Sequence, residues 1–192
     1  VTPPPTVTLT FTLDNPNAYD TSDEDYFGES VAISGNYAIV AAKEEGDATG
    51  IRSGKAYIYD VTTGALLHTL NDPNAFGTSA NDLFGSSVAI SGNYAIVGAL
   101  GEADAGGSQS GKAYIFNAVT GALLQTLDNP NAFGTSAADY FGGSVGISGN
   151  YAIVSARGED DAGGTGSGKA YIFDVTTGAL VYTLDNPNAF ST

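Results

Sequence analysis

The chain repeats itself every 57 residues, and this repeat constrains its fold more than any other feature. Three motifs recur at that spacing: Phe-Gly at Phe27, Phe84 and Phe141, Gly-Asn at Gly35, Gly92 and Gly149, and Gly-Lys at Gly54, Gly111 and Gly168. The spacing divides the 192 residues into a lead at 1–13, units at 14–70, 71–127 and 128–184, and the start of a fourth unit at 185–192. Because a repeat buries its hydrophobic face against its neighbours, the units are expected to stack into one array.

Each unit has the pattern of four β-strands. In the first unit these are residues 30–34, 37–41, 55–59 and 65–70. The first two alternate and are rich in β-branched side chains, and Gly35-Asn36 between them is typical of a tight hairpin turn. Gly64 supplies the positive φ of the loop between the last two, and no segment keeps a helical period. The unit is therefore predicted to be a four-stranded antiparallel meander of the size of a propeller blade.

These strand and turn residues also carry a family resemblance. The segment FGSSVAISGNYAIVGA at 84–99, followed by GKAYIF at 111–116, resembles the FG-GAP repeats of bacterial surface proteins and, more distantly, the integrin α propeller. The resemblance extends over all three units. It implies a blade architecture, an extracellular setting, and roles in adhesion or assembly rather than in catalysis.

The predicted fold is all-β, with three tandem four-stranded blades in a β-propeller-like array that is either incomplete or tightly closed. Known propellers close with about four to eight blades, so three blades are expected to leave sheet surface exposed. One extra N-terminal strand is predicted at 8–13, at the same repeat position as the fourth strands at 65–70, 122–127 and 179–184. Because the third unit already has its own fourth strand, the N-terminal one is surplus.

The surplus strand is the candidate for assembly. An apolar strand without a partner tends to pair with a neighbouring chain, and the Pro-rich leader at 1–6 is stiff enough to carry it there. The bridging residues are then Thr6, Val7, Thr8, Leu9, Thr10, Phe11, Thr12 and Leu13. A head-to-tail contact between unlike surfaces either closes a ring or grows a helical filament, and we favour the filament. Two alternatives stay open: residues 7–13 pair with their own first blade as an edge strand, or the 192 residues are a segment of a longer propeller.

Composition excludes several classes of function. The 21 acidic residues outnumber the 6 lysines and arginines, and the net charge of −15 repels nucleic acids and anionic membranes. Without cysteine and with one histidine, the chain has neither thiolate centres nor sites that need two imidazoles. That histidine, His68, is matched by Gln125 and Tyr182 in the other units, which favours an outward-facing strand position over a catalytic base. We expect no enzyme activity.

The chain is expected outside the cell. No apolar run approaches the roughly 20 residues that span a bilayer, so no membrane insertion is expected. The sequence contains no methionine, which indicates a processed chain or the ordered part of one, and removal of an export signal is the simplest explanation. The predicted location is therefore extracellular or at the cell surface.

Two repeated loops carry carboxylates suited to calcium. The loop between the second and third strands reads Glu-x-Asp-x-x-Gly, which is similar to the start of a calcium-binding loop. Its candidate ligands are Glu45, Asp47, Glu102, Asp104, Glu159 and Asp161. The loop before the first strand of the first unit adds Asp20, Asp23 and Asp25. The alternative is a solvated acidic surface in the first case and an Asx-Pro turn in the second.

The leading function is a secreted structural subunit that polymerises with copies of itself into an extracellular filament. The rival is a calcium-dependent adhesion or ligand-binding module, with glycans or surface receptors as partners. The aromatic pairs at 57 and 59, 114 and 116, and 171 and 173 are expected to pack the blades, with a stacking platform for sugars as the alternative.

Overall fold

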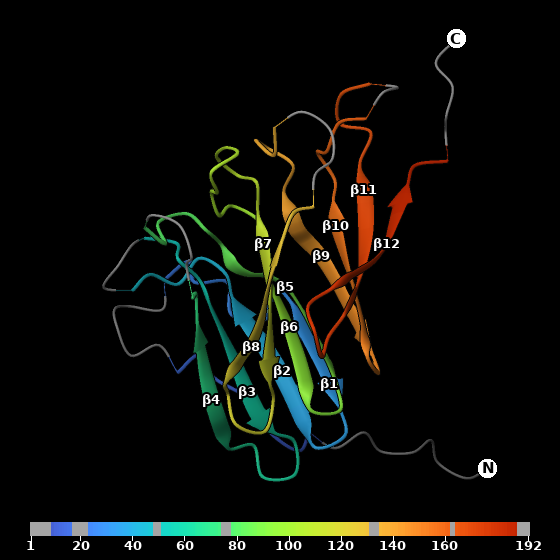
Figure 1. The fold of residues 1–192 in the computed structure, drawn as a ribbon. Coiled ribbons are helices and arrows are strands. Elements are labelled where there is room, and N and C mark those ends of the chain that lie inside the picture. The colour runs from blue at the N-terminus through green and yellow to red at the C-terminus, as the bar shows by residue number, and fades with distance from the viewer. Residues whose placement is uncertain are drawn as a thin grey trace, which may run out of the picture.

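The computed structural model describes residues 9–16, 23–47, 51–73, 78–130, 135–161 and 164–187, and within them it has twelve strands and no helix. The first sheet contains β1 (Val31–Ser34), β2 (Tyr37–Ala42), β3 (Lys55–Asp60) and β4 (Leu66–Asn71). The second contains β5 (Phe84–Ser91), β6 (Tyr94–Ala99), β7 (Lys112–Asn117) and β8 (Leu123–Asp128). The third contains β9 (Phe141–Ser148), β10 (Tyr151–Ala156), β11 (Lys169–Asp174) and β12 (Leu180–Asp185). Each sheet is an antiparallel meander in chain order, as predicted (Figure 1).

The two turns of each unit form as the sequence predicts. Gly35, at the β1–β2 turn, has a φ of +57°, and Gly64, at the β3–β4 turn, has a φ of +73°. In the β3–β4 turn the carboxylate of Asp60 accepts hydrogen bonds from the main-chain amides of Thr62 and Thr63. These bonds and the Thr62 hydroxyl hold the pKa of Asp60 below its usual value. Local side-chain bonding therefore fixes the turn and, with it, the register of the hairpin.

The core lies between the sheets, because each sheet turns alternate side chains toward each neighbour. On β6, Val97 belongs to the cluster shared with the first sheet, whereas the adjacent Ile96 belongs to the cluster shared with the third. Both side chains are completely buried. The second sheet is therefore covered on both faces, and the first and third sheets form the two ends of a stack.

An aromatic cluster recurs in each unit. The phenylalanine of Phe-Gly packs against the two aromatic rings of the third strand, and in the second unit Phe84 lies 5.9 Å from Tyr114 and 6.0 Å from Phe116, between ring centroids. The equivalent contacts join Phe27 to Tyr57 and Tyr59, and Phe141 to Tyr171 and Phe173. All six third-strand rings are buried, so the predicted role in blade packing is confirmed.

Of the two arrangements expected for three blades, the structure has the incomplete one. Strand contacts in the described residues join the first sheet to the second and the second to the third, and no contact of similar extent joins the third back to the first. The described part of the chain also contains no helix of the length and apolarity that would cross a bilayer.

The expected N-terminal strand differs from the structure. Residues 9–13 have no strand conformation, and none of the three described sheets includes them. Instead, Leu13 packs against the outer face of the first sheet, and the hydroxyl of Tyr59 donates to the main-chain oxygen of Asp14 at 3.2 Å. Thr6, Val7 and Thr8 lie outside the described residues.

Candidate functional site

The junction between neighbouring blades is built around a glycine with positive φ. In the first junction the amide of Phe84 donates to the carbonyl of Ser53 at 2.9 Å, and Gly54 lies so close that a Cβ there would meet the Phe84 carbonyl oxygen at 2.0 Å. The second junction repeats this with Phe141, Ser110 and Gly111, at the same 2.9 Å and 2.0 Å. Only glycine permits this approach of two backbones.

A second contact ties the outer strand of each blade to the next blade. His68 on β4 lies 2.9 Å from the carbonyl of Val119, and Gln125 on β8 donates to the carbonyl of Thr176 at 3.0 Å. His68 is half-buried by this contact. His68 is a residue of strand β4, as predicted, and its ring also contacts the next blade.

The N-terminal segment occupies the place of such an outer strand. Phe11 stands one repeat before His68, and its ring lies over Gly64 as His68 lies over Gly121: a Cβ on either glycine would meet the ring at 2.9 Å. The amide of Asn15 donates to Asp25 at 2.7 Å, as that of Asn129 donates to Asp139 in the third unit. Residues 9–15 thus contact the first blade as the fourth strand of a preceding blade would.

The two ends of the stack expose residues that are buried inside it. Val31 and Ile33 on β1 are 61% and 69% exposed, whereas their repeat equivalents on β5, Val88 and Ile90, are each 7% exposed. At the other end, Ile153 on β10 is 42% exposed, whereas its repeat equivalents Ile39 and Ile96 are fully buried. The exposed face of the third sheet therefore resembles the face of the first sheet that packs against β5 inside the stack. The exposed face of the first sheet, in turn, resembles the face of β5 that receives it.

The predicted calcium glutamates lie in the interior. Glu45, Glu102 and Glu159 are all completely buried, and each accepts a hydrogen bond from the tyrosine twelve residues later, at 2.6 Å, 2.5 Å and 2.5 Å. In the first and third units the other oxygen accepts a bond from the ammonium of Lys55 or Lys169, at 2.7 Å and 3.0 Å. The glutamate thus links its own loop to the third strand of its sheet.

The electrostatics of these buried groups follow from their contacts. Burial, and then the hydrogen bond to the glutamate, raises the pKa of Tyr57 and of Tyr171 far above the usual range of a phenol. Burial acts to lower the pKa of Lys169, but the contact with Glu159 outweighs it, and the pKa is raised. The tyrosine therefore stays a hydrogen-bond donor and the lysine stays charged at neutral pH.

The aspartates of the same loops serve other partners. Asp104 accepts hydrogen bonds from the amides of Gly106 and Gly107 and from the hydroxyl of Ser136 in the next unit, and Asp161 accepts one from the amide of Gly164. Asp47 is half-buried. The glutamates and aspartates of the repeated pattern do not gather into a common group in the described residues. Calcium binding by this pattern stays a prediction.

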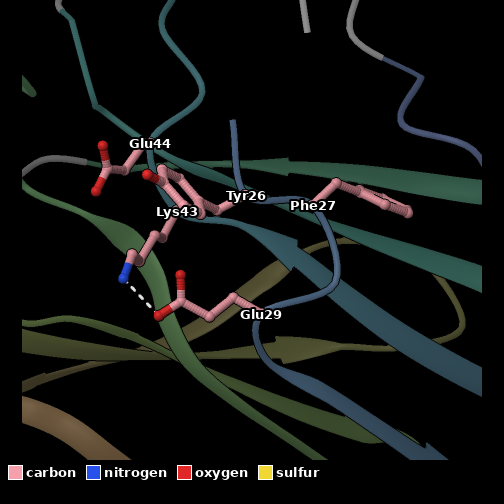
Figure 2. A pocket seen from close by; sticks show the side chains of 5 residues that line it. All are labelled: Tyr26, Phe27, Glu29, Lys43 and Glu44. Carbon is pink, nitrogen blue, oxygen red and sulfur yellow. Dashed lines mark hydrogen bonds and ion pairs between the residues drawn. The ribbon is translucent and has the colours of Figure 1, made fainter. Parts of the chain in front are cut away.

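The predicted ligands in the loop before β1 lie in different surroundings. Asp20 lies outside the described residues, Asp23 is exposed, and Asp25 is buried and bonded by Asn15. A shallow depression beside this loop is lined by Tyr26, Phe27, Glu29, Lys43 and Glu44 (Figure 2). The Lys43 ammonium pairs with Glu29 at 2.5 Å, while the Phe27 ring points the other way.

One group of carboxylates is brought together within the described residues. Asp72, Asp82 and Glu102 each place an oxygen within 4.8 Å of the other two. The pKa of Asp82 is raised to about 6, chiefly by burial; a hydrogen bond with Asp72 acts to lower it and the charge of Glu102 acts to raise it. Of these three, only Glu102 is among the metal ligands predicted from the sequence.

Sequence reasoning missed the junction glycines and the buried lysines, although both carry a signal. Gly-Lys recurs in every unit at a fixed ten residues after the loop glutamate, and the tyrosine follows the lysine by two. A lysine and a glutamate that are retained together at one spacing in three copies indicate an ion pair.

Comparisons with known proteins agree with this architecture. A family model described as FG-GAP repeat matches the chain three times, over residues 17–59, 75–116 and 132–173. A search of curated proteins finds no match.

Similar solved structures show a likeness of fold alone. The computationally designed Ika4 protein is 15% identical, with a TM-score of 0.51 over 92% of this chain and 77% of that one. Hydrazine synthase from Kuenenia stuttgartiensis is 14% identical, with a TM-score of 0.50 over 82% of this chain and 37% of that one. BamB from Moraxella catarrhalis is 18% identical, with a TM-score of 0.49 over 85% of this chain and 38% of that one.

Proposed function

Given that the chain belongs to the FG-GAP repeat family, we propose that it is a secreted structural subunit whose copies join head to tail into an extracellular filament. The observation that carries the proposal is the position of Phe11 over Gly64, where a preceding blade would place its fourth strand. The family's extracellular setting supports the location. The propeller-like stack of blades supplies the geometry.

Complementary ends support the head-to-tail contact. The exposed face of the third sheet presents Ile153, whose equivalent Ile39 packs in one cluster with Val88 and Ile90 of the next blade. The exposed face of the first sheet presents Val31 and Ile33, which are the repeat equivalents of Val88 and Ile90. A third sheet of one copy can therefore pack on the first sheet of another with contacts that the chain already uses twice internally. A surface that meets an unlike surface in this way propagates.

The N-terminal segment distinguishes a filament from a ring. Residues 9–14 read LTFTLD and β12 reads LVYTLD, at the same position of the repeat. Where two copies meet, β12 of the first copy and residues 9–14 of the second would both occupy the fourth-strand position beside the first blade of the second copy. We infer that the N-terminal strand pairs with β11 of the neighbour in exchange for β12, whose six residues are all exposed. The intermolecular junction then differs from the internal ones, and the rotation between copies need not close.

Deletion of residues 1–13 tests this proposal. The intact chain is expected to form rods in negative-stain microscopy and to scatter light as a polymer, whereas the chain beginning at Asp14 is expected to stay at the mass of one copy. A matched control replaces Thr12 by serine, which keeps the apolar face of the segment. Equal assembly by the truncated chain would overturn the role of the strand, and discrete closed particles of the intact chain would overturn the filament.

A further inference from the structure

The three units offer a comparison within one molecule, because the second unit departs from the other two at one buried position. In the first and third units the side-chain amide of Asn15 or Asn129 donates to a buried aspartate at 2.7 Å. In the second unit the residue order Asp-Asn becomes Asn-Asp, so Asp72 stands where the others have asparagine. The neighbour of the buried aspartate is thus a second carboxyl group instead of an amide.

The lysine of the second unit also has a different ion pair. Lys55 and Lys169 pair with the buried glutamates of their own units, at 2.7 Å and 3.0 Å. Lys112 pairs with Asp128 at the end of β8, where the first unit has Asn71. In the third unit Lys169 also lies 3.8 Å from the equivalent Asp185, so the pair with the edge carboxylate is closest in the second unit.

The remaining carboxylates converge around Asp82. This residue is 4% exposed, and its Oδ2 atom is buried and has no hydrogen-bond partner among the described residues. The carboxylate oxygens of Asp72 and Glu102 lie within 4.8 Å of it and of each other. A buried carboxylate oxygen without a donor is costly unless a proton or a cation satisfies it.

We propose that Asp72, Asp82 and Glu102 bind a calcium ion in the second unit, at a site that the first and third units lack. The donor set consists of carboxylate oxygens, which favours a hard cation over zinc or copper. Two ligands of one calcium ion at 2.3–2.6 Å lie at most about 5 Å apart, and all three oxygens satisfy this limit. Asp72 is the half-buried member, so an ion reaches the site from its side.

The ion joins two connections of the same blade. Asp72 and Asp82 lie at the two ends of the connection from β4 to β5, and Glu102 lies in the loop between β6 and β7. The site therefore fixes the edge of the second sheet from which both blade junctions start, at Phe84 and at Gly111. Occupancy is expected to raise the stability of the folded chain through mass action.

Calcium titration of three proteins tests the site: the wild-type chain, Asp72→Asn and Asp23→Asn. Isothermal titration of the metal-free wild type is expected to show one ion per chain and a rise in melting temperature. Asp72→Asn restores the amide of the other units, so it is expected to lose calcium affinity by about tenfold or more and to melt higher than the wild type without metal. Asp23→Asn removes one carboxylate from the first loop and is expected to bind as the wild type does.

The outcomes separate this site from the alternatives. No binding to the wild type at millimolar calcium, or unchanged binding by Asp72→Asn, would overturn the proposal. Loss of binding in Asp23→Asn instead would assign the ion to the first loop. The chain that begins at Asp14 retains all three ligands and is expected to bind equally, so the result does not depend on filament formation.

Discussion

Replacement of Gly111 by alanine is expected to destabilise the folded chain by roughly 2–5 kcal/mol and to separate the third blade from the second. The added Cβ would lie 2.0 Å from the carbonyl oxygen of Phe141, and main-chain atoms cannot move away without opening the junction. The φ of +80° adds the cost of a left-handed conformation. Urea unfolding followed by circular dichroism, which reports the free energy of unfolding, checks this.

Gly168 is the matched control in the third unit. It has the same left-handed conformation, with a φ of +74°, but the nearest atom to an added Cβ is the Arg157 carbonyl oxygen at 3.2 Å. Gly168→Ala is therefore expected to cost only the backbone term, about 1–2 kcal/mol. Equal losses in the two variants would contradict the assignment of Gly111 to a tightly packed blade junction.

Replacement of Lys169 by methionine is expected to cost about 3–5 kcal/mol at neutral pH. The change keeps the apolar stem but leaves the completely buried Glu159 without the ammonium that lies 3.0 Å from it. The remaining hydrogen bond from Tyr171 does not neutralise the charge. Thermal unfolding monitored by calorimetry measures the loss.

The control for this change is Lys43→Met, which breaks the pair with Glu29 in the depression of the first unit. The side chain of Glu29 is 43% exposed, so water solvates the remaining charge and the expected loss is within about 1 kcal/mol. A larger loss in Lys43→Met than in Lys169→Met would mean that the buried pair does not hold the third sheet to its loop.

The repeat predicts the blades well because their causes are local. Alternation along 30–34 and 37–41, the Gly35-Asn36 turn and the glycine at 64 determine hairpins without reference to the rest of the chain. In the first unit the strands form within one residue of the predicted bounds, whereas β5 and β9 begin three residues earlier than the repeat predicts. The incomplete stack follows from the number of units. These are the features for which spacing within one unit is sufficient.

The candidate site depends on contacts between segments that the sequence does not bring together. Glu102 fits the pattern of a calcium loop, yet its buried carboxylate accepts a hydrogen bond from Tyr114 on β7. Asp72 is visible in the sequence as an exchange with asparagine, but its importance depends on Asp82 being buried beside it. Residues 9–13 do not form a strand because they lie beside the first sheet in the fourth-strand position of a preceding blade. The described chain has no preceding blade, and so no third strand of that blade with which they could pair.

Disulfide trapping between copies tests the head-to-tail contact most directly, because the chain has no cysteine of its own. Inside the chain, the amide of Gly92 donates to the hydroxyl of Ser34 at 3.1 Å across a junction, so the variant Ser34→Cys with Gly92→Cys serves as the internal control. The equivalent pair between copies is Ser148 of one and Gly35 of the next. With Ser148→Cys and Gly35→Cys in one chain, we expect a ladder of covalent multimers on a non-reducing gel. A single band at the mass of one copy, under conditions in which the control forms its internal bond, would contradict it.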